Sequence, residues 1–153
     1  MRKQDLNANI KVEEYKINWS WNKKTDFWLM RHCIGHTLNV CCGMSKAGHI
    51  RIDIDPTVKP DILCDIKDLP YAPQSFDTVI CDPPFSFYNR FKWIYRLADL
   101  AKYRLILSAP GGIFPRVKGF KTEYKATIQR GNLFVRYWLF YTKKNQRLFN
   151  ELD

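Results

Sequence analysis

The chain has 153 residues, 46% of them hydrophobic and 15% aromatic, which is enough to bury the core of one domain without disulfide or metal staples. The 25 Lys and Arg against 15 Asp and Glu give a formal charge of +10, which suits a polyanionic partner but also fits a basic, soluble surface without one. No apolar run approaches the ~18 residues of a membrane-spanning helix, and no apolar secretory segment follows the N-terminus. We therefore expect no membrane contact and an intracellular, cytoplasmic location.

The five cysteines include no CxxC pair, and four of them fall in or beside apolar segments typical of strands. Small buried thiols in a reducing compartment explain this distribution best. Cys33 and His36 would need two further ligands to hold zinc, and the sequence offers no convincing pair. We therefore predict no metal site.

Residues 1–18 are polar and mixed in charge, with a weak apolar alternation that fits an arm or an edge strand. A dense aromatic cluster follows, and Thr25 or Asp26 is a plausible N-cap for a helix over residues 27–33. Clusters of this kind more often pack against a sheet than bind a ligand. We expect the same of this one, which consists of Trp19, Trp21, Phe27, Trp28 and Met30.

A short apolar strand over residues 37–41 runs into a turn that contains Gly43 and Gly48. Glycine permits a tight turn and close approach of the backbone to a ligand. The next strand, over residues 49–55, alternates cleanly, and seven residues connect the two strands. Parallel crossovers normally take a dozen or more residues, yet seven extended residues span about 25 Å, enough to return along a strand of ~17 Å. The sequence therefore predicts a crossover without a helix.

Two acids, Asp53 and Asp55, end that second strand, where nucleotide-binding α/β folds use an acid to bind ribose hydroxyls. Their spacing of two puts both side chains on one face, so one of them is sufficient as a ligand. Asp55 precedes Pro56 and also suits the start of a turn. Two solvated acids at a strand end are the alternative.

A proline-rich connection over residues 56–60 is too short for a helix, and residues 61–64 fit a third strand that ends at Asp65. A fourth strand over residues 76–81 then stops abruptly at Asp82, Pro83, Pro84 and Phe85. Prolines lack N–H groups and fix φ, so the carbonyls of Asp82 and Pro83 can be held rigidly as acceptors. An acceptor pair beside an aromatic ring suits a planar base that carries an amino group. An ordinary strand end followed by a Pro-Pro turn is the alternative.

Ser86 suits the cap of a helix from Phe87 to about Tyr103, with an apolar stripe at Phe91, Ile94, Tyr95, Ala98 and Ala101. Arg90 and Lys92 lie largely off that stripe and start close to the expected base pocket. Such charges usually form a solvated face, but these two can also contact phosphates.

A fifth strand is expected over residues 104–109. The loop that follows carries Arg116 and Lys118, which we expect near the active edge of the sheet as further nucleic-acid contacts. Residues 120–130 and 133–142 then form a hairpin about Gly131-Asn132, a pair of residues suited to a tight turn.

The motif at Asp82 resembles the Asp-Pro-Pro-Tyr/Phe/Trp signature of S-adenosylmethionine-dependent methyltransferases that act on amino groups of nucleic-acid bases. The resemblance extends from about Thr37 to Pro110, roughly half the chain, and the motifs come in the family's order. It implies an α/β, Rossmann-like sheet, mostly parallel with a C-terminal antiparallel hairpin. The short connections add that crossover helices are few and short.

This resemblance also implies roles for individual residues. The backbone of Cys41, Cys42 and Gly43 would border the methionine part of the cofactor, and Asp53 is a better match than Asp55 to the ribose-binding acid. Asp65 would accept from the adenine amino group, and Ile66 would pack on the ring. Asp82 and Pro83 would hold the substrate amino group, Phe85 would stack on the base, and Asp82 can also contact the cofactor.

The resemblance further divides the expected single domain over residues 1–153 into three parts. Residues 1–36 form an aromatic arm, which related enzymes use as a lid over the cofactor. Residues 37–110 form the cofactor and catalytic core, and residues 120–142 form the closing hairpin. No segment is large enough for a separate target-recognition domain, so a homodimer and a partner that supplies specificity are both candidates.

The resemblance favours methylation of adenine N6 or cytosine N4 in DNA. Methylation of adenine N6 or guanine N2 in RNA is a second hypothesis. A non-catalytic nucleic-acid-binding module that keeps the fold is a third. A 5-methylcytosine mechanism needs a thiolate nucleophile after a proline, and the sequence contains no Pro-Cys pair.

Overall fold

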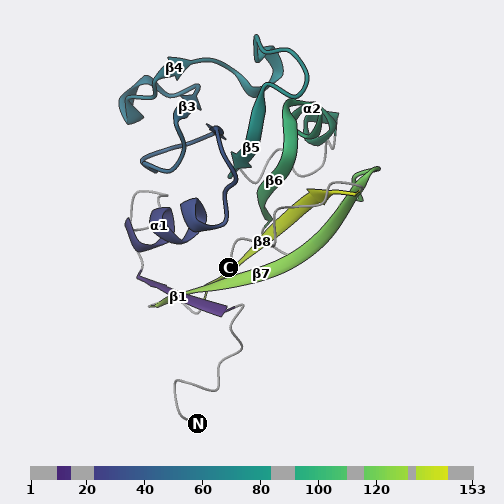
Figure 1. Ribbon diagram of the computed structural model, residues 1–153. Helices are drawn as coiled ribbons and strands as arrows, with labels where there is room; N and C mark the ends of the chain where they lie inside the picture. Colours follow the sequence, from purple (N-terminus) through teal and green to yellow (C-terminus); the bar gives the residue numbers. More distant parts are fainter. Residues whose placement is uncertain (1–9, 15–22, 84–91, 110–115, 131–133, 145–153) are drawn as a thin grey trace.

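The computed structural model describes residues 10–14, 23–83, 92–109, 116–130 and 134–144, and these form one eight-stranded sheet with two α-helices beside it (Figure 1). The strand order is β1-β7-β8-β6-β5-β2-β3-β4. All neighbouring strands are parallel except β8, which is antiparallel to both β6 and β7. The expected mostly parallel α/β sheet with a C-terminal antiparallel hairpin is confirmed. No helix in the described ranges is long and apolar enough to cross a membrane.

The helices and strands come in the following order along the chain. They are β1 (Ile10–Glu14), α1 (Lys23–Arg31), β2 (Thr37–Val40), β3 (Ile50–Asp53), the 3₁₀ helix η1 (Pro56–Val58), β4 (Ile62–Leu63), the 3₁₀ helix η2 (Ile66–Asp68), β5 (Phe76–Cys81), α2 (Lys92–Leu100), β6 (Ala101–Ala109), β7 (Phe120–Arg130) and β8 (Phe134–Lys143). The predicted fourth strand has the predicted bounds, and β1 confirms the edge-strand alternative for part of the N-terminal region.

Two hydrophobic layers cover the two faces of the sheet. On the face covered by α1, here called the α1 face, Leu29 packs with Ile80, Ile106 and Trp138. On the opposite α2 face, buried side chains of α2 pack with their strand neighbours, among them Val79, Leu105 and Leu139. Successive strand residues therefore alternate between the layers, as a sheet buried on both faces requires. Each large aliphatic side chain buried in this way contributes about 1.5–3 kcal/mol.

The helix boundaries differ from those predicted. Helix α1 begins at Lys23, so Thr25 and Asp26 lie inside its first turns, and neither is the N-cap. Helix α2 ends at Leu100, and the residues predicted to extend it to Tyr103 instead begin β6, where Ala101 pairs with Phe76. Strand pairing overrides helical periodicity at this point. Ser86 and residues 87–91 lie outside the described residues.

The buried stripe of α2 is also rotated from the predicted one. Tyr95, assigned to the stripe, is 52% exposed, whereas Trp93 and Leu97 are buried beside the predicted Ile94 and Ala98. Helix α2 therefore packs on the sheet with a face that is rotated from the predicted one by about one residue, which corresponds to about 100° around the helix axis.

Aromatic packing attaches α1 to the sheet. The Trp28 ring centroid lies 6.1 Å from that of Trp138 and 5.9 Å from that of Phe140. For Trp28 the expectation of packing against a sheet is confirmed, whereas Phe27 is 73% exposed. Trp19 and Trp21 lie outside the described residues.

The predicted crossover without a helix is present between β2 and β3, and a polar network stabilises it. The Ser45 hydroxyl donates to Asp26 Oδ1 at 2.6 Å, and Ser45 Oγ accepts from Asn39 Nδ2 at 3.2 Å and from the Ala47 N–H at 3.1 Å. Asp26 Oδ2 also accepts from the Lys46 N–H at 3.0 Å. One buried serine therefore connects α1, β2 and the crossover.

We predict that Ser45→Ala lowers the free energy of unfolding by about 2 kcal/mol, because it leaves buried donors and a carboxylate without their partner. Urea unfolding measures the loss. Ser75→Ala is the matched control, since the Ser75 hydroxyl donates only to Ala72 O in an exposed turn and should cost less than ~0.5 kcal/mol. Equal losses in the two variants would contradict a stabilising role for the network.

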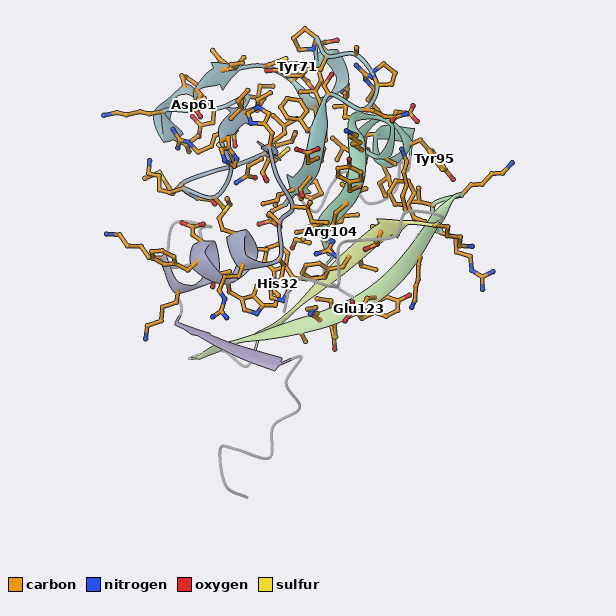
Figure 2. All side chains as sticks on the ribbon, viewed as in Figure 1. His32, Asp61, Tyr71, Tyr95, Arg104 and Glu123 are labelled. Atoms are coloured by element: carbon orange, nitrogen blue, oxygen red, sulfur yellow. The ribbon has the colours of Figure 1, made fainter. Side chains whose placement is uncertain are left out.

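His32 follows α1 and is held in its neutral form. Its Nδ1 lies 2.7 Å from Trp28 O, and because a carbonyl only accepts, Nδ1 carries the proton. Its Nε2 therefore accepts from Lys125 Nζ at 3.2 Å. Burial, followed by the charges of Lys125 and Arg104, lowers the pKa of His32 below its usual 6.5. Figure 2 shows His32 and Arg104 between α1 and the β7–β8 pair.

Because the pKa of His32 is lower in the folded than in the unfolded chain, the unfolded chain takes up this proton first as the pH falls. We therefore predict that stability declines as the pH falls below 6.5. His32→Asn should flatten this decline, since an amide can keep both hydrogen bonds without titrating. Urea unfolding between pH 7.5 and 5 tests it, with exposed His36→Asn as the control that keeps the decline. An unchanged slope in His32→Asn would contradict the assignment.

Candidate active site

The carboxyl ends of β3, β2 and β5 meet at one edge of the sheet. Val40 pairs with Ile52 on one side and with Cys81 on the other, and all three strands are parallel. Neighbouring strands lie about 4.8 Å apart, so Cys41, Asp53 and Asp82 emerge side by side. The structure thus brings together three segments that lie up to about 40 positions apart in the printed sequence. We call this edge the acidic edge.

Asp53 connects the first turn to the end of β3. Its Oδ2 accepts from the Gly43 N–H at 2.8 Å, and its Oδ1 accepts from the Asp55 N–H at 3.0 Å. Each carboxylate oxygen has two lone pairs, so each can accept one further hydrogen bond. Asp53 can therefore hold the turn and bind a pair of ligand hydroxyls at the same time.

The neighbouring Asp55 is the N-cap of the 3₁₀ helix η1. Its Oδ1 accepts from the Thr57 N–H at 2.8 Å and from the Thr57 hydroxyl at 2.7 Å, which caps η1. These bonds lower the pKa of the Asp55 carboxyl. The prediction that Asp55 begins a turn is confirmed, and its carboxylate is already engaged with Thr57.

The turn after β2 presents backbone to open space. Gly43 has φ of 50°, and a Cβ added there would meet no heavy atom within 4 Å. Cys41, which has a side chain, also has a positive φ of 53°. That conformation costs a non-glycine residue about 1–2 kcal/mol, and such strain concentrates at ligand sites. Two left-handed residues bend the chain sharply where the strand ends.

Thiols at the acidic edge are held protonated. Burial, then the charge of Asp53, raises the pKa of the Cys42 thiol to about 12. Burial also raises the pKa of Cys81 well above its usual value, assisted by a hydrogen bond with Cys41 and by the charges of Asp82 and Asp53. Cys42 and Cys81 are therefore unsuited to act as nucleophiles near neutral pH. Both carboxylates act on Cys81, as expected if they flank the same strand end.

Asp65 and Ile66 follow β4 on the same side of the sheet, since Leu63 pairs with Asp53. Asp65 Oδ1 accepts from the Lys67 N–H at 2.9 Å and caps η2. Ile66 is only 4% exposed and packs in the core of the α2 face. Its side chain therefore offers little surface to an adenine ring, and packing of Ile66 on that ring stays a prediction.

The proposed catalytic segment is described only at its start. Asp82 is half-buried and Pro83 is buried directly after β5. Pro84, Phe85 and Arg90 lie outside the described residues. Lys92 is the first residue of α2, and the position of its side chain is not described.

The expectation that Arg116 and Lys118 lie near the acidic edge is wrong. Phe120, the first residue of β7, pairs with Lys143 at the end of β8, and β8 is antiparallel to β6. Residues just before β7 therefore lie at the amino edge of the parallel strands, opposite Asp82.

No protein-family profile matches the chain, and no curated protein matches it. Among solved structures, the Escherichia coli protein yhhF, provisionally named a methyltransferase, is 11% identical, with a TM-score of 0.52 over 80% of this chain and 88% of that chain. A SAM-dependent methyltransferase from Aquifex aeolicus is 11% identical, with a TM-score of 0.48 over 78% and 89%. A mutant of MtNAS in complex with S-adenosylmethionine is 16% identical, with a TM-score of 0.44 over 79% and 60%. Together with the strand order, the likeness to yhhF shows a Rossmann-like methyltransferase fold.

Proposed function

We propose that the protein is an S-adenosylmethionine-dependent methyltransferase that methylates an exocyclic amino group of a nucleobase, with adenine N6 or cytosine N4 of DNA favoured. The observation that carries this proposal is the convergence of Asp53, the Gly43 turn and Asp82 at one edge of a methyltransferase-type sheet. Ligand sites of open parallel sheets lie at the carboxyl ends of the strands.

The described residues of the acidic edge fit this cofactor. Gly43 leaves open space for its methionine part, and the remaining lone pairs of Asp53 suit two ribose hydroxyls. Asp65 suits the adenine amino group, beside the backbone of Ile66. The carboxylates also complement the positive charge of a sulfonium and an ammonium group. When bound, S-adenosylmethionine would supply an electrophilic methyl group there.

Asp82 and Pro83 would then activate the substrate nitrogen by positioning it. The lone pair of an exocyclic amino group is delocalised into its ring, which makes the nitrogen a poor nucleophile. Hydrogen bonds from the amino group to the Asp82 carboxylate and the Pro83 carbonyl favour a more tetrahedral nitrogen with a localised lone pair. Orientation of this kind can remove several kcal/mol from a barrier. Phe85 would stack on the base, contributing about 1–3 kcal/mol.

A non-catalytic nucleic-acid-binding module with this fold is the second candidate. The observation that favours it is the burial of Ile66, which is covered by protein where the resemblance implies an adenine contact. Cofactor binding separates the two candidates.

We predict that isothermal titration calorimetry detects S-adenosylmethionine binding and that Asp53→Ala weakens it at least tenfold, because hydrogen bonds to a charged group contribute about 1.5–3 kcal/mol. Asp65→Ala should weaken it in the same direction. Asp68→Ala, which removes an exposed acid from the same region, is the matched control and should bind normally. Absence of binding heat with folded wild-type protein would favour the non-catalytic module.

We predict that Asp82→Asn lowers methyl transfer at least ~100-fold while S-adenosylmethionine binding changes little. Transfer of a tritiated methyl group to DNA and, separately, to RNA measures the rate, and nucleoside analysis identifies the base. Asp68→Asn should keep wild-type turnover. If Asp82→Asn also keeps it, the role assigned to Asp82 is wrong.

A further inference from the structure

The excess positive charge of the chain is distributed unevenly. Residues 53–82, which end at the acidic edge, contain seven Asp and only two Lys. Residues 116–144, which include all of β7 and β8, contain eight Lys and Arg and one acid, Glu123. Lys125 of this set lies on the α1 face beside His32, whereas Lys118 and Lys143 line a cleft beside α2, so a polyanion is attracted to the strand ends there and repelled by the surroundings of Asp82. A nucleic-acid substrate must be held at those strand ends while one base reaches the acidic edge.

Three exposed tyrosines lie along the same region. Tyr124 on β7 and Tyr137 on β8 are 50% and 37% exposed, and Tyr95 on α2 is 52% exposed. Tyr124 pairs with Leu139, and Leu139 and Tyr141 are buried in the α2 face. Since side chains alternate along a strand and cross-strand partners share a face, Tyr124 and Tyr137 also lie on the α2 face. All three rings thus lie on one side of the molecule.

A cleft of about 300 Å³ lies on the same side of the molecule, at the amino edge of the sheet between α2 and the ends of β7 and β8. Its lining includes Tyr95, Lys118, Phe120 and Lys143, and Asp99 is its acid. Lys143 Nζ lies 5.8 Å from the centroid of the Phe120 ring. Figure 2 shows Tyr95 on the outer side of α2, beside these strand ends. The cleft therefore combines aromatic surface with two ammonium groups.

The surface continues from the cleft to the acidic edge. Six positions separate Lys143 from Tyr137 along β8, about 20 Å. Tyr137 pairs with Ala109 on β6, two positions beyond Leu107, which pairs with Cys81. Tyr137 is therefore level with Pro83 and two strands away, at about 10 Å.

We propose that this surface, the tyrosine path made of Tyr95, Lys118, Tyr124, Tyr137 and Lys143, binds single-stranded nucleic acid and leads it to Asp82. The inference rests on the proposed function and adds the substrate form. Bases stack on the tyrosine rings, and phosphates lie near the two lysines. Stacking requires base faces that a duplex conceals, so the path selects a single strand.

Fluorescence anisotropy with a labelled 20-nucleotide single strand, without cofactor, tests the path. We expect Tyr124→Leu/Tyr137→Leu to raise Kd at least ~tenfold, and Tyr124→Phe/Tyr137→Phe to bind as wild type because stacking is kept. Lys118→Gln/Lys143→Gln should reduce the slope of log Kd against log salt by about 1.4, since each phosphate contact in a single strand contributes about 0.7. Oligodeoxythymidine and oligouridine arms distinguish DNA from RNA.

The matched control is Lys23→Gln/Phe27→Leu, which removes an exposed lysine and an exposed aromatic ring from α1 on the other face. It should bind as wild type. Normal binding by the tyrosine-to-leucine variant, equal weakening in the control, or equal affinity for a duplex would overturn the path. If the leucine variant does not fold, the lysine variant tests the path independently. An unchanged salt slope in the lysine variant would also overturn the path.

Failure of the path and failure of the proposed function give different results. If methyl transfer depends on Asp82 but single-strand binding ignores the tyrosines, the path is wrong and the proposed function stands. If binding depends on the tyrosines but methyl transfer is undetectable, the path stands and the proposed function fails.

Discussion

Parallel pairing of β2 with β3 and β5 is the constraint on which the rest of the structure depends. All four residues of β2 are buried, with Leu38 and Val40 in the hydrophobic layer of the α2 face and Asn39 in the polar network with Ser45. The polar residues at the carboxyl ends of these strands therefore lie at the edge of the sheet. The register places Asp53 and Asp82 on either side of the Gly43 turn. A negative edge beside exposed backbone is the consequence, and it suits a cationic ligand that also carries hydroxyl and amino groups.

The connections between the parallel strands β2, β3 and β4 contain no α-helix, and side-chain hydrogen bonds stabilise them instead. Asp26 and Ser45 stabilise the connection between β2 and β3, while Asp55 and Asp65 begin the 3₁₀ turns η1 and η2. At the edge itself, Asp53 and Asp65 make local bonds that orient the backbone and keep further acceptor capacity. The same carboxylates thus shape the loops and give the edge its charge.

Much of the fold was predictable because short apolar runs separated by glycine and proline fix the strands of a parallel sheet. The fourth strand, the helix-free crossover and the two acids after the second strand all follow from local sequence signals. The role of Asp26 was missed, because its partner Ser45 is distant in the sequence and an acid before an apolar segment also suits a cap. Tyr95 was misplaced by one step of the helical wheel, and Arg116 and Lys118 were misplaced because strand direction depends on pairing across the sheet. The adenine-packing role of Ile66 was inferred from the resemblance, and in the structure its side chain is buried in the core of the α2 face.

We propose that S-adenosylmethionine binds at the acidic edge. An NMR titration of ¹⁵N-labelled protein with S-adenosylhomocysteine tests this most directly, because it reports every amide at once and needs no turnover. The largest shifts are expected at the amides of Gly43, Asp55 and Ile66, with those of Phe120 and Lys143 unchanged. Saturable shifts centred on Phe120 and Lys143, or none with folded protein at millimolar ligand, would contradict the claim.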